Sequence, residues 1–261
     1  MVVFNLMKNI FFPAIYLMDR LRYPLNFGLI FLVVLVPLIL SSVNLVSSAN
    51  NDIQVLENER KGLAYIHVVR QLIEHVQQHR GMANAYLSGA RSFKVRMMDK
   101  RLHVDQHLAE LLRVDSALGV GFKTGARISA LRLQWNSIKQ ASLTQDFVNS
   151  IILKSHNVFL ADLISLISLV ADESEMTFDH QRDTYYLGAA VANSLINLAE
   201  NMGQARAVGA GVATRGLSTQ KSLVGLSVLS NNIDQHAKDF SAGLQVAIDA
   251  NERLGIDLHA A

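Results

Sequence analysis

The stretch VRQLIEHVQQHRGMANAYL (residues 69–87) decides the fold, because its apolar and small residues recur with the spacing of a helix packed in a core. Those residues advance alternately by four and three positions, and one arginine occupies a place in the series. The series is Val69, Ile73, Val76, Arg80, Ala83 and Leu87. This heptad spacing is typical of a helix whose seam faces other helices. We therefore predict that Arg80 carries its charge into a helical core.

A second stretch, LINLAENMGQARAVGAGVA (residues 195–213), matches the first at an offset of 126 residues, which maps Arg80 onto Arg206. The corresponding seam is Leu195, Ala199, Met202, Arg206, Gly209 and Ala213. A guanidinium keeps its proton, and burying it unpaired costs several kcal/mol. Each arginine is therefore expected to need a carboxylate, water or a bound anion.

Two packed helices carrying these seams would bring the arginines together where small residues leave room. Like charges repel there unless an anion lies between them, and planar guanidinium groups suit nitrate or a carboxylate. The predicted ligand site consists of Arg80, Arg206, Gln78, Gln204, Gly81, Ala83 and Gly209.

An internal salt bridge is the alternative explanation for each arginine. The acidic candidates are Glu74, Glu200 and Asp183. Glu74 and Glu200 lie six positions before Arg80 and Arg206, so neither faces the arginine of its own helix. Any partner must come from another helix.

The segment GLIFLVVLVPLILSSVNLV (residues 28–46) has no charged residue and approaches the roughly 20 apolar residues that cross a bilayer. We predict a transmembrane helix over residues 25–48, with a cleaved signal peptide as the alternative. Residues 1–24 mix aromatic and basic residues and are expected to form a cytoplasmic or interfacial amphipathic segment. The positive-inside tendency then places residues 49–261 in the periplasm.

After residue 50 the chain has no proline, and its apolar spacing predicts an all-α fold. The expected helices cover residues 51–88, 93–117, 124–140, 145–172, 180–215 and 219–255. Because the first and fifth are long, we predict an elongated rod of about six helices that form two stacked four-helix-bundle-like modules.

Two histidine pairs with i, i+4 spacing form a weaker candidate for a metal or haem site. They are His75 with His79 and His103 with His107, and a hairpin between them would set the pairs level. No second shell of carboxylates or haem-attachment motif accompanies them, so a solvated polar face is the favoured interpretation.

Composition narrows the function classes further. The formal net charge is +2 with both signs mixed, which does not suggest nucleic-acid binding, and the absence of cysteine excludes disulfides and a thiol nucleophile. Phosphate-binding glycine loops and hydrolase motifs are absent, so we expect no enzyme activity and no cofactor.

Four segments together resemble the extracytoplasmic part of bacterial membrane receptors that carry a nitrate- and nitrite-sensing domain. They are QQHRGMANAYLSG (77–89), ENERKGLAYIHVVRQL (57–72), DTYYLGAAVANSLINLAENMGQARAVGAGVATRG (183–216) and LMDRLRYPLNFGLI (17–30). Such receptors include chemotaxis proteins, sensor kinases and diguanylate cyclases. The resemblance implies that two arginines bind the anion, and Arg80 and Arg206 match them. A related helical sensor class binds small organic acids, so a carboxylate ligand stays open.

The sequence therefore predicts a sensor input module in the bacterial inner membrane, which binds a small anion. The expected partners are that anion, the membrane, a second copy in a homodimer, and a signalling domain or partner outside these residues. The alternative is a membrane-anchored structural or adaptor rod that binds another protein and no small ligand. An enzyme in a downstream segment is a third possibility.

Overall fold

The computed structural model describes residue 16 and residues 22–142, 149–177 and 182–254 of the chain. The helices are α2 (Tyr23–Leu87), α3 (Phe93–Phe122), α4 (Gly125–Ala141), α5 (Asn149–Glu173), α6 (Arg182–Ala189), the π-helix η1 (Ala190–Leu195), α7 (Ile196–Arg215) and α8 (Gln220–Ala250). These ranges contain no strand, so the prediction of an all-α fold is confirmed.

Most predicted helix ends lie within a few residues of the observed ones, because local backbone signals set them. Gly216 ends α7 in a left-handed conformation with φ 66°, which glycine adopts without steric cost. Thr219 then begins α8 with a capping box, in which its hydroxyl accepts a hydrogen bond from the Ser222 amide. The predicted helix over residues 180–215 is divided by the π-helical turn η1, which apolar spacing does not reveal.

The contacts divide the chain into two units, Met1–Gln54 and Val55–Ala261, which are described separately. In the first unit, α2 has an apolar stretch with none of its residues buried, long and apolar enough to cross a membrane. Pro37 lies inside it. The predicted segment over residues 1–24 falls almost wholly outside the described residues, so its amphipathic character stays a prediction.

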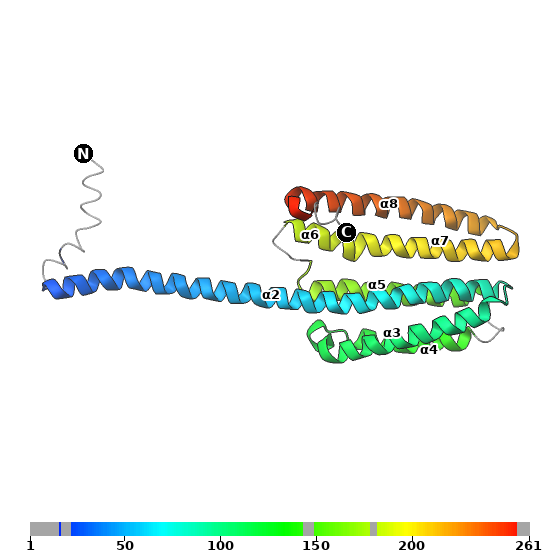
Figure 1. The fold of residues 1–261 in the computed structure, drawn as a ribbon, viewed down its shortest axis with the longest axis horizontal. Helices are drawn as coiled ribbons and strands as arrows, with labels where there is room; N and C mark the ends of the chain where they lie inside the picture. The colour runs from blue at the N-terminus through cyan, green and yellow to red at the C-terminus, as the bar shows by residue number, and fades with distance from the viewer. Residues whose placement is uncertain (1–15, 17–21, 143–148, 178–181, 255–261) are drawn as a thin grey trace. The chain divides into compact units, whose positions relative to one another are not determined.

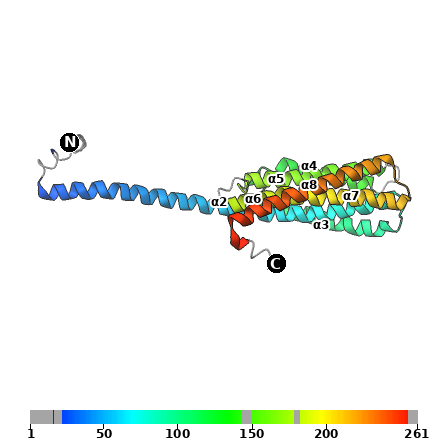
Figure 2. The same cartoon turned by 90° about the horizontal axis from the view of Figure 1, so that it is seen from above.

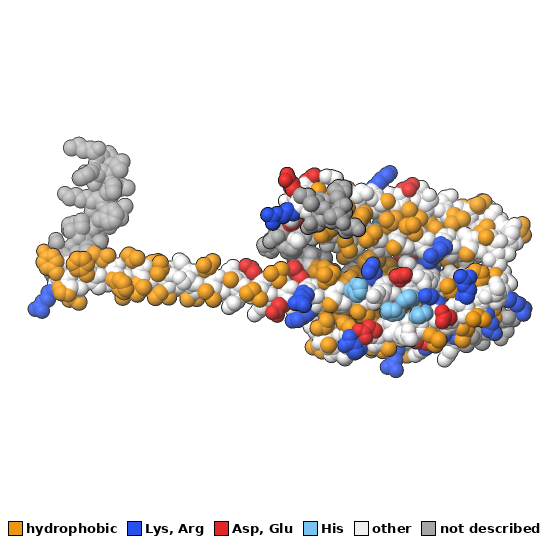
Figure 3. Space-filling view, in the orientation of Figure 1, with side chains coloured by type: hydrophobic (Ala, Val, Ile, Leu, Met, Phe, Trp, Pro, Cys, Tyr) orange, Lys and Arg blue, Asp and Glu red, His pale blue; other side chains and the backbone are white. Residues whose placement is uncertain are grey.

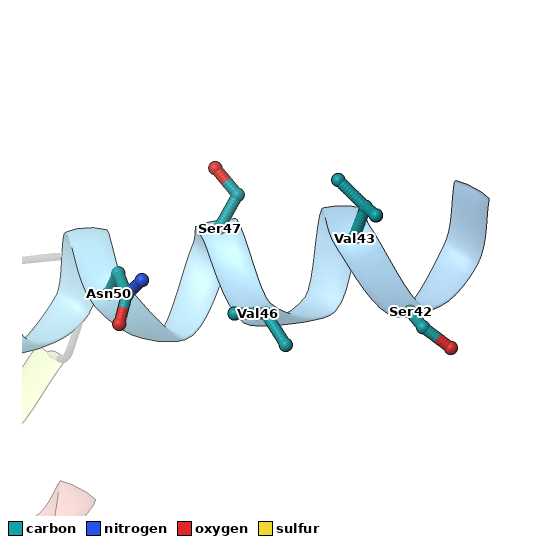
Figure 4. Close-up of a pocket in the computed structure, with 5 residues that line it drawn as sticks. All are labelled: Ser42, Val43, Val46, Ser47 and Asn50. Atoms are coloured by element: carbon teal, nitrogen blue, oxygen red, sulfur yellow. The ribbon is translucent and has the colours of Figure 1, made fainter. Parts of the chain in front are cut away.

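The polar residues of this apolar stretch lie on successive turns of a single helix. Figure 4 shows Ser42, Val43, Val46, Ser47 and Asn50, which line a shallow hollow on the surface of α2. The hydroxyl of Ser42 donates to the carbonyl of Leu38 at 2.8 Å, so its hydrogen-bonding capacity is met within the helix. One helix alone forms this hollow, and it encloses no ligand-sized space.

In the second unit, residues 55–87 of α2 and α5 lie between two pairs of helices. Hairpin α3–α4 packs on one side, and α6, η1 and α7 pack with α8 on the other (Figures 1 and 2). The described end of α8 returns beside the start of α6, where the Asn251 amide donates to Asp183 at 2.7 Å. The last helix therefore ends at the level where α6 begins.

The helices of this unit lie side by side along their length, with α2 and α5 between the α3–α4 hairpin and the group of α6, α7 and α8 (Figures 1 and 2). Helix α3 has 30 residues and α8 has 31, and the continuous run from α6 to α7 is similarly long. When helices of comparable length pack side by side, parallel or antiparallel, all of them begin or end at the same two ends of the unit. The long helices therefore run along the whole length of this unit.

The largest continuous core forms where α2 meets α3, α4 and α5. Trp135 of α4, Phe159 of α5 and Tyr65 of α2 are completely buried within it. Helix α5 is also apolar enough to resemble a membrane span, but its apolar face is packed into this core. Its hydrophobicity is therefore explained by the bundle.

Candidate functional site

Helices α2 and α7 run in the same direction, and their contacts have a constant register. Gln77 contacts Glu200 and Asn84 contacts the Ala207 carbonyl, in both cases 123 residues further along the chain. The sequence repeat has an offset of 126 residues instead. This difference of three residues places Gly203, and not Arg206, opposite Arg80.

Arg80 is completely buried and forms an ion pair across this contact. Its Nη1 lies 2.5 Å from Oε1 of Glu200, and its Nη2 lies 3.3 Å from Oε2. Nη1 also donates to Oδ1 of Asn157 on α5 at 2.9 Å. One guanidinium thus connects α2 to both α5 and α7, which makes it a junction of the bundle.

The Glu200 carboxylate accepts hydrogen bonds from three side chains. Arg80 donates to both oxygens, Gln77 donates to Oε2 at 2.8 Å, and Gln204 donates to Oε1 at 2.9 Å. We call Arg80, Gln77 and Gln204 the donor cradle. Glutamine amides and a guanidinium supply only N–H donors in this arrangement, and they hold the planar Glu200 carboxylate.

Two glycines on α7 allow this close approach of the helices. A Cβ atom at Gly203 would lie 2.9 Å from Nη2 of Arg80, and one at Gly211 would lie 2.8 Å from Nδ2 of Asn84. Real Cβ contacts are longer, so a side chain at either position would push the helices apart. The predicted space-making residues Gly81 and Gly209 have no atom within 4 Å of such a Cβ, and they do not create this contact.

Arg206 lies outside the cradle. It is exposed, and within the described ranges no hydrogen bond or ion pair to it is found. The α7 residues that face the core are Ile196, Glu200, Gly203, Ala207 and Gly211. The predicted α7 seam is therefore on the wrong face, because the helices pack through their smallest residues and not through the repeat.

The other predicted site residues divide between the cradle and its surroundings. Gln204 belongs to the cradle, whereas Gln78 donates to Glu74 on the exposed side of α2 at 3.0 Å. Ala83 is buried on the seam as expected. Gln77, and not Gln78, is the hydrogen-bond donor beside Arg80. Gln77 lies three positions before Arg80, and residues with this spacing share one face of a helix, so the sequence could have indicated it.

The four histidines do not form a metal site. Among the described residues, no group of histidine, cysteine or acidic side chains has the geometry to hold a metal ion. His75 packs against His103 and His107 with ring centroids 5.4 Å and 4.4 Å apart, and histidines gather on this face in Figure 3. His79, the fourth residue of the candidate set, contacts His156 instead, so the four histidines are not brought together at one point.

His79 lies apart from the other three histidines, in the core beside Arg80. Its Nδ1 lies 2.9 Å from Nε2 of His156, whose Nδ1 lies 2.8 Å from the Ile152 carbonyl. A carbonyl only accepts, so His156 donates to Ile152 and, when both rings are neutral, accepts from His79. Burial, with the Arg80 and Arg101 charges, lowers the pKa of His156 to about 4, and burial holds the pKa of His79 well below its usual value.

An apolar stretch of α2 is thus followed along the chain by an all-helical unit with a buried ion pair of Arg80 and Glu200. A family model described as nitrate and nitrite sensing matches residues 71–250, more than half of the chain. The chain therefore belongs to the nitrate and nitrite sensing family, which is a sensing family and not a catalytic one. No curated protein and no solved structure shows a significant match.

Proposed function

We propose that residues 49–261 are the extracytoplasmic input module of a bacterial transmembrane signalling receptor that senses a small anion. The family match supports a sensing role, and the apolar part of α2 supports anchoring by a single membrane span. In this proposal the amino terminus is cytoplasmic, the span is in the inner membrane, and the module faces the periplasm. The signalling output belongs to a partner or to a segment outside these residues, such as a chemotaxis, kinase or cyclase domain.

The donor cradle is the observation that carries the ligand proposal. It holds a planar group with two charged oxygens, the Glu200 carboxylate, by four hydrogen bonds. Nitrite and small carboxylates present two oxygens in the same plane, and nitrate presents three. In this proposal the Glu200 carboxylate occupies the position of the anion, and the ligands are nitrite, nitrate or a small carboxylate.

An incoming anion would compete with Glu200 for Arg80. Two anions side by side in a buried site repel, so binding requires that Glu200 leave or become neutral. The Nε–H group of Arg80 is buried without an acceptor among the described residues, and it offers one further donor to a ligand oxygen.

Because Arg80 is on α2 and Glu200 is on α7, this exchange changes the contact between the two helices. Asn157 keeps Arg80 attached to α5 while the bond to α7 is replaced. A ligand that binds one arrangement of α2 and α7 better shifts the population toward it. Movement of α7 against α2 would then pass the signal toward the membrane.

Arg206 has a secondary part in the proposal. It is exposed on α7, two residues after Gln204. An exposed cation attracts anions at long range and is screened by salt, so it would speed binding more than it holds the ligand.

Titration calorimetry of the full chain in nanodiscs with nitrite, nitrate and acetate tests this function. We expect the variant Glu200→Gln to bind nitrite at least about tenfold more tightly, because it removes the competing charge and keeps a hydrogen-bonding amide. Glu74→Gln removes an exposed carboxylate of the neighbouring turn and serves as the matched control. Unchanged affinity in Glu200→Gln would contradict competition at the cradle.

The adaptor rod remains the second candidate, and the ion pair of Arg80 with Glu200 favours it. A protein that binds no small ligand would have its buried arginine paired in this way. The double variant Arg80→Met with Glu200→Met separates the candidates, since it replaces the pair with apolar side chains. If this double variant folds and loses anion binding, the sensing function is supported. If the unaltered chain binds none of these anions, the adaptor rod is supported.

A further inference from the structure

A long groove lies between α2 and the run from α6 to α7, and Gln77 of the donor cradle is one of the residues that line it. Its volume is about 860 Å³, within the range of sites for small organic molecules. On α2 it extends from Leu56 to Gln77, which is about 30 Å at roughly 1.5 Å per residue. The groove therefore has the dimensions of a site for an elongated ligand.

The groove exists because α2 and α7 approach each other closely only further along the chain. They meet where Gly203 and Gly211 have no side chains. Before these glycines the facing residues include branched aliphatic side chains, such as Val191 and Ile196. Because the side chains at a contact set the distance between two helices, the larger ones leave a space here.

The walls of the groove are mainly aliphatic. Ile66, Ile73 and Ile196 form its inner part and are at most 7% exposed. Leu63 and Leu195 line its outer part and are 58% and 39% exposed. No aromatic residue lines it among the described side chains. Walls without an aromatic ring offer no stacking surface for a planar ligand, so they suit a flexible aliphatic chain.

The charged residues that line the groove all belong to α2, and their interactions differ by sign. Glu74 accepts a hydrogen bond from Gln78 at 3.0 Å, and Glu59 also takes part in an interaction. Within the described ranges, no hydrogen bond or ion pair to Arg60 or Arg70 is found. A guanidinium binds a carboxylate through two parallel hydrogen bonds. The border of the groove is thus better prepared for an anionic head group than for a cationic one.

We propose that the groove binds an aliphatic monocarboxylate of medium chain length, such as octanoate. Its carboxylate pairs with Arg70, which lies between Ile66 and Ile73 on the same helical stripe. Its chain lies along Ile66 and Leu63, which are within two turns, or about 10 Å, of Arg70. This ligand is separate from the anion of the donor cradle, and the inference does not depend on anion binding there.

A chain-length series tests the apolar part of the site. The full chain in nanodiscs is titrated calorimetrically with butyrate, hexanoate and octanoate, and the heats from empty nanodiscs are subtracted because fatty acids partition into lipid. Each step buries two further CH₂ groups, so we expect the affinity to rise about tenfold per step. An affinity that does not rise with chain length overturns the proposal.

Two matched variants locate the binding to the groove. Leu63→Glu places a charge against the bound chain, and we expect octanoate to bind at least about tenfold more weakly. Leu102→Glu is the control, since Leu102 is 60% exposed on α3 and does not line the groove. Equal effects of the two variants overturn the proposal. So does a Leu63→Glu variant that changes the mass of the assembly and leaves octanoate binding unaltered, because a protein then covers the groove.

The head group is tested with a second pair of variants. Arg70→Gln should weaken octanoate binding about twofold to fivefold, as expected for an exposed ion pair, and should leave 1-octanol binding unchanged. Arg132→Gln, at an exposed position of α4, is the control and should change neither. Octylamine that binds as tightly as octanoate overturns the choice of a carboxylate. Nitrite should bind Leu63→Glu as it binds the unaltered chain, so failure of this proposal is distinguishable from failure of the anion proposal.

Discussion

The seams around Arg80 and Arg206 share a sequence pattern and have opposite environments. The α2 seam is buried, and its arginine is paired with Glu200 and Asn157. The α7 seam is exposed except at the half-buried Gly209, and its arginine faces solvent. The comparison shows that periodicity identifies a coherent face of a helix, whereas the helix that covers this face depends on the register of packing.

The largest expected effect comes from removing each arginine in turn. Arg80→Ala leaves the Glu200 carboxylate buried without its charge partner, and we expect the free energy of unfolding to fall by about 3 to 5 kcal/mol. Arg206→Ala removes an exposed side chain, and its effect should stay within about 0.5 kcal/mol. Denaturant unfolding of the full chain in detergent measures both. Similar losses in the two variants would show that Arg206 is buried in the protein as well.

A pH titration of stability is the second prediction, and it concerns the α2 seam alone. The α7 seam has no counterpart of His79, because the residue 126 positions later in the chain is Ala205. The folded pKa of His156 is lowered to about 4, while the unfolded chain takes up its proton near 6.5. Between these values the unfolded state binds more protons, so stability is complete above about pH 6.5 and falls as the pH drops toward 4.

Complete titration of His156 corresponds to a loss of about 3 kcal/mol, to which His79 adds in the same direction. Thermal melting across this pH range measures the slope, and His156→Gln should make it shallower. If His156→Gln melts with the slope of the unaltered chain, the buried pair is not the cause.

The smallest expected effect distinguishes two glycines of α7. Gly203→Ala places a methyl group against the fixed guanidinium of Arg80 and should lower stability by about 1 to 3 kcal/mol. Gly209→Ala meets no atom within 4 Å and should raise stability by up to about 1 kcal/mol, through helix propensity. Urea unfolding midpoints compare them. A loss at Gly209 as large as that at Gly203 would indicate that the register of 126 residues is the correct one.

Much of the fold could be predicted from the sequence because its signals are local. Apolar spacing and glycine or capping residues located most of the helices, and the heptad pattern around Val69 and Val76 identified the buried side of α2. The burial of Arg80 and its need for a partner from another helix also followed from that pattern. These features depend on residues that are near one another along the chain.

The identity of the cradle residues could not be predicted in the same way. The repeat favoured Gln78 and placed Arg206 opposite Arg80, whereas close packing at Gly203 and Gly211 selected Gln77 and Glu200. A shift of three residues between two helices changes which side chains meet, and no local signal records it. The π-helical turn η1 escaped prediction for a similar reason, since one wide turn leaves the apolar composition unchanged.

The sequence by itself determined an apolar helix followed by an all-helical unit, with one arginine forced into a core by its place on a seam. It could do so because helix formation and amphipathic spacing are local properties of the chain. Only the tertiary structure decided that the helices lie side by side, that Glu200 occupies the donor cradle, and that the second arginine stays in solvent. Those outcomes depend on how closely α2 and α7 approach, and the small residues of two distant segments set that distance together.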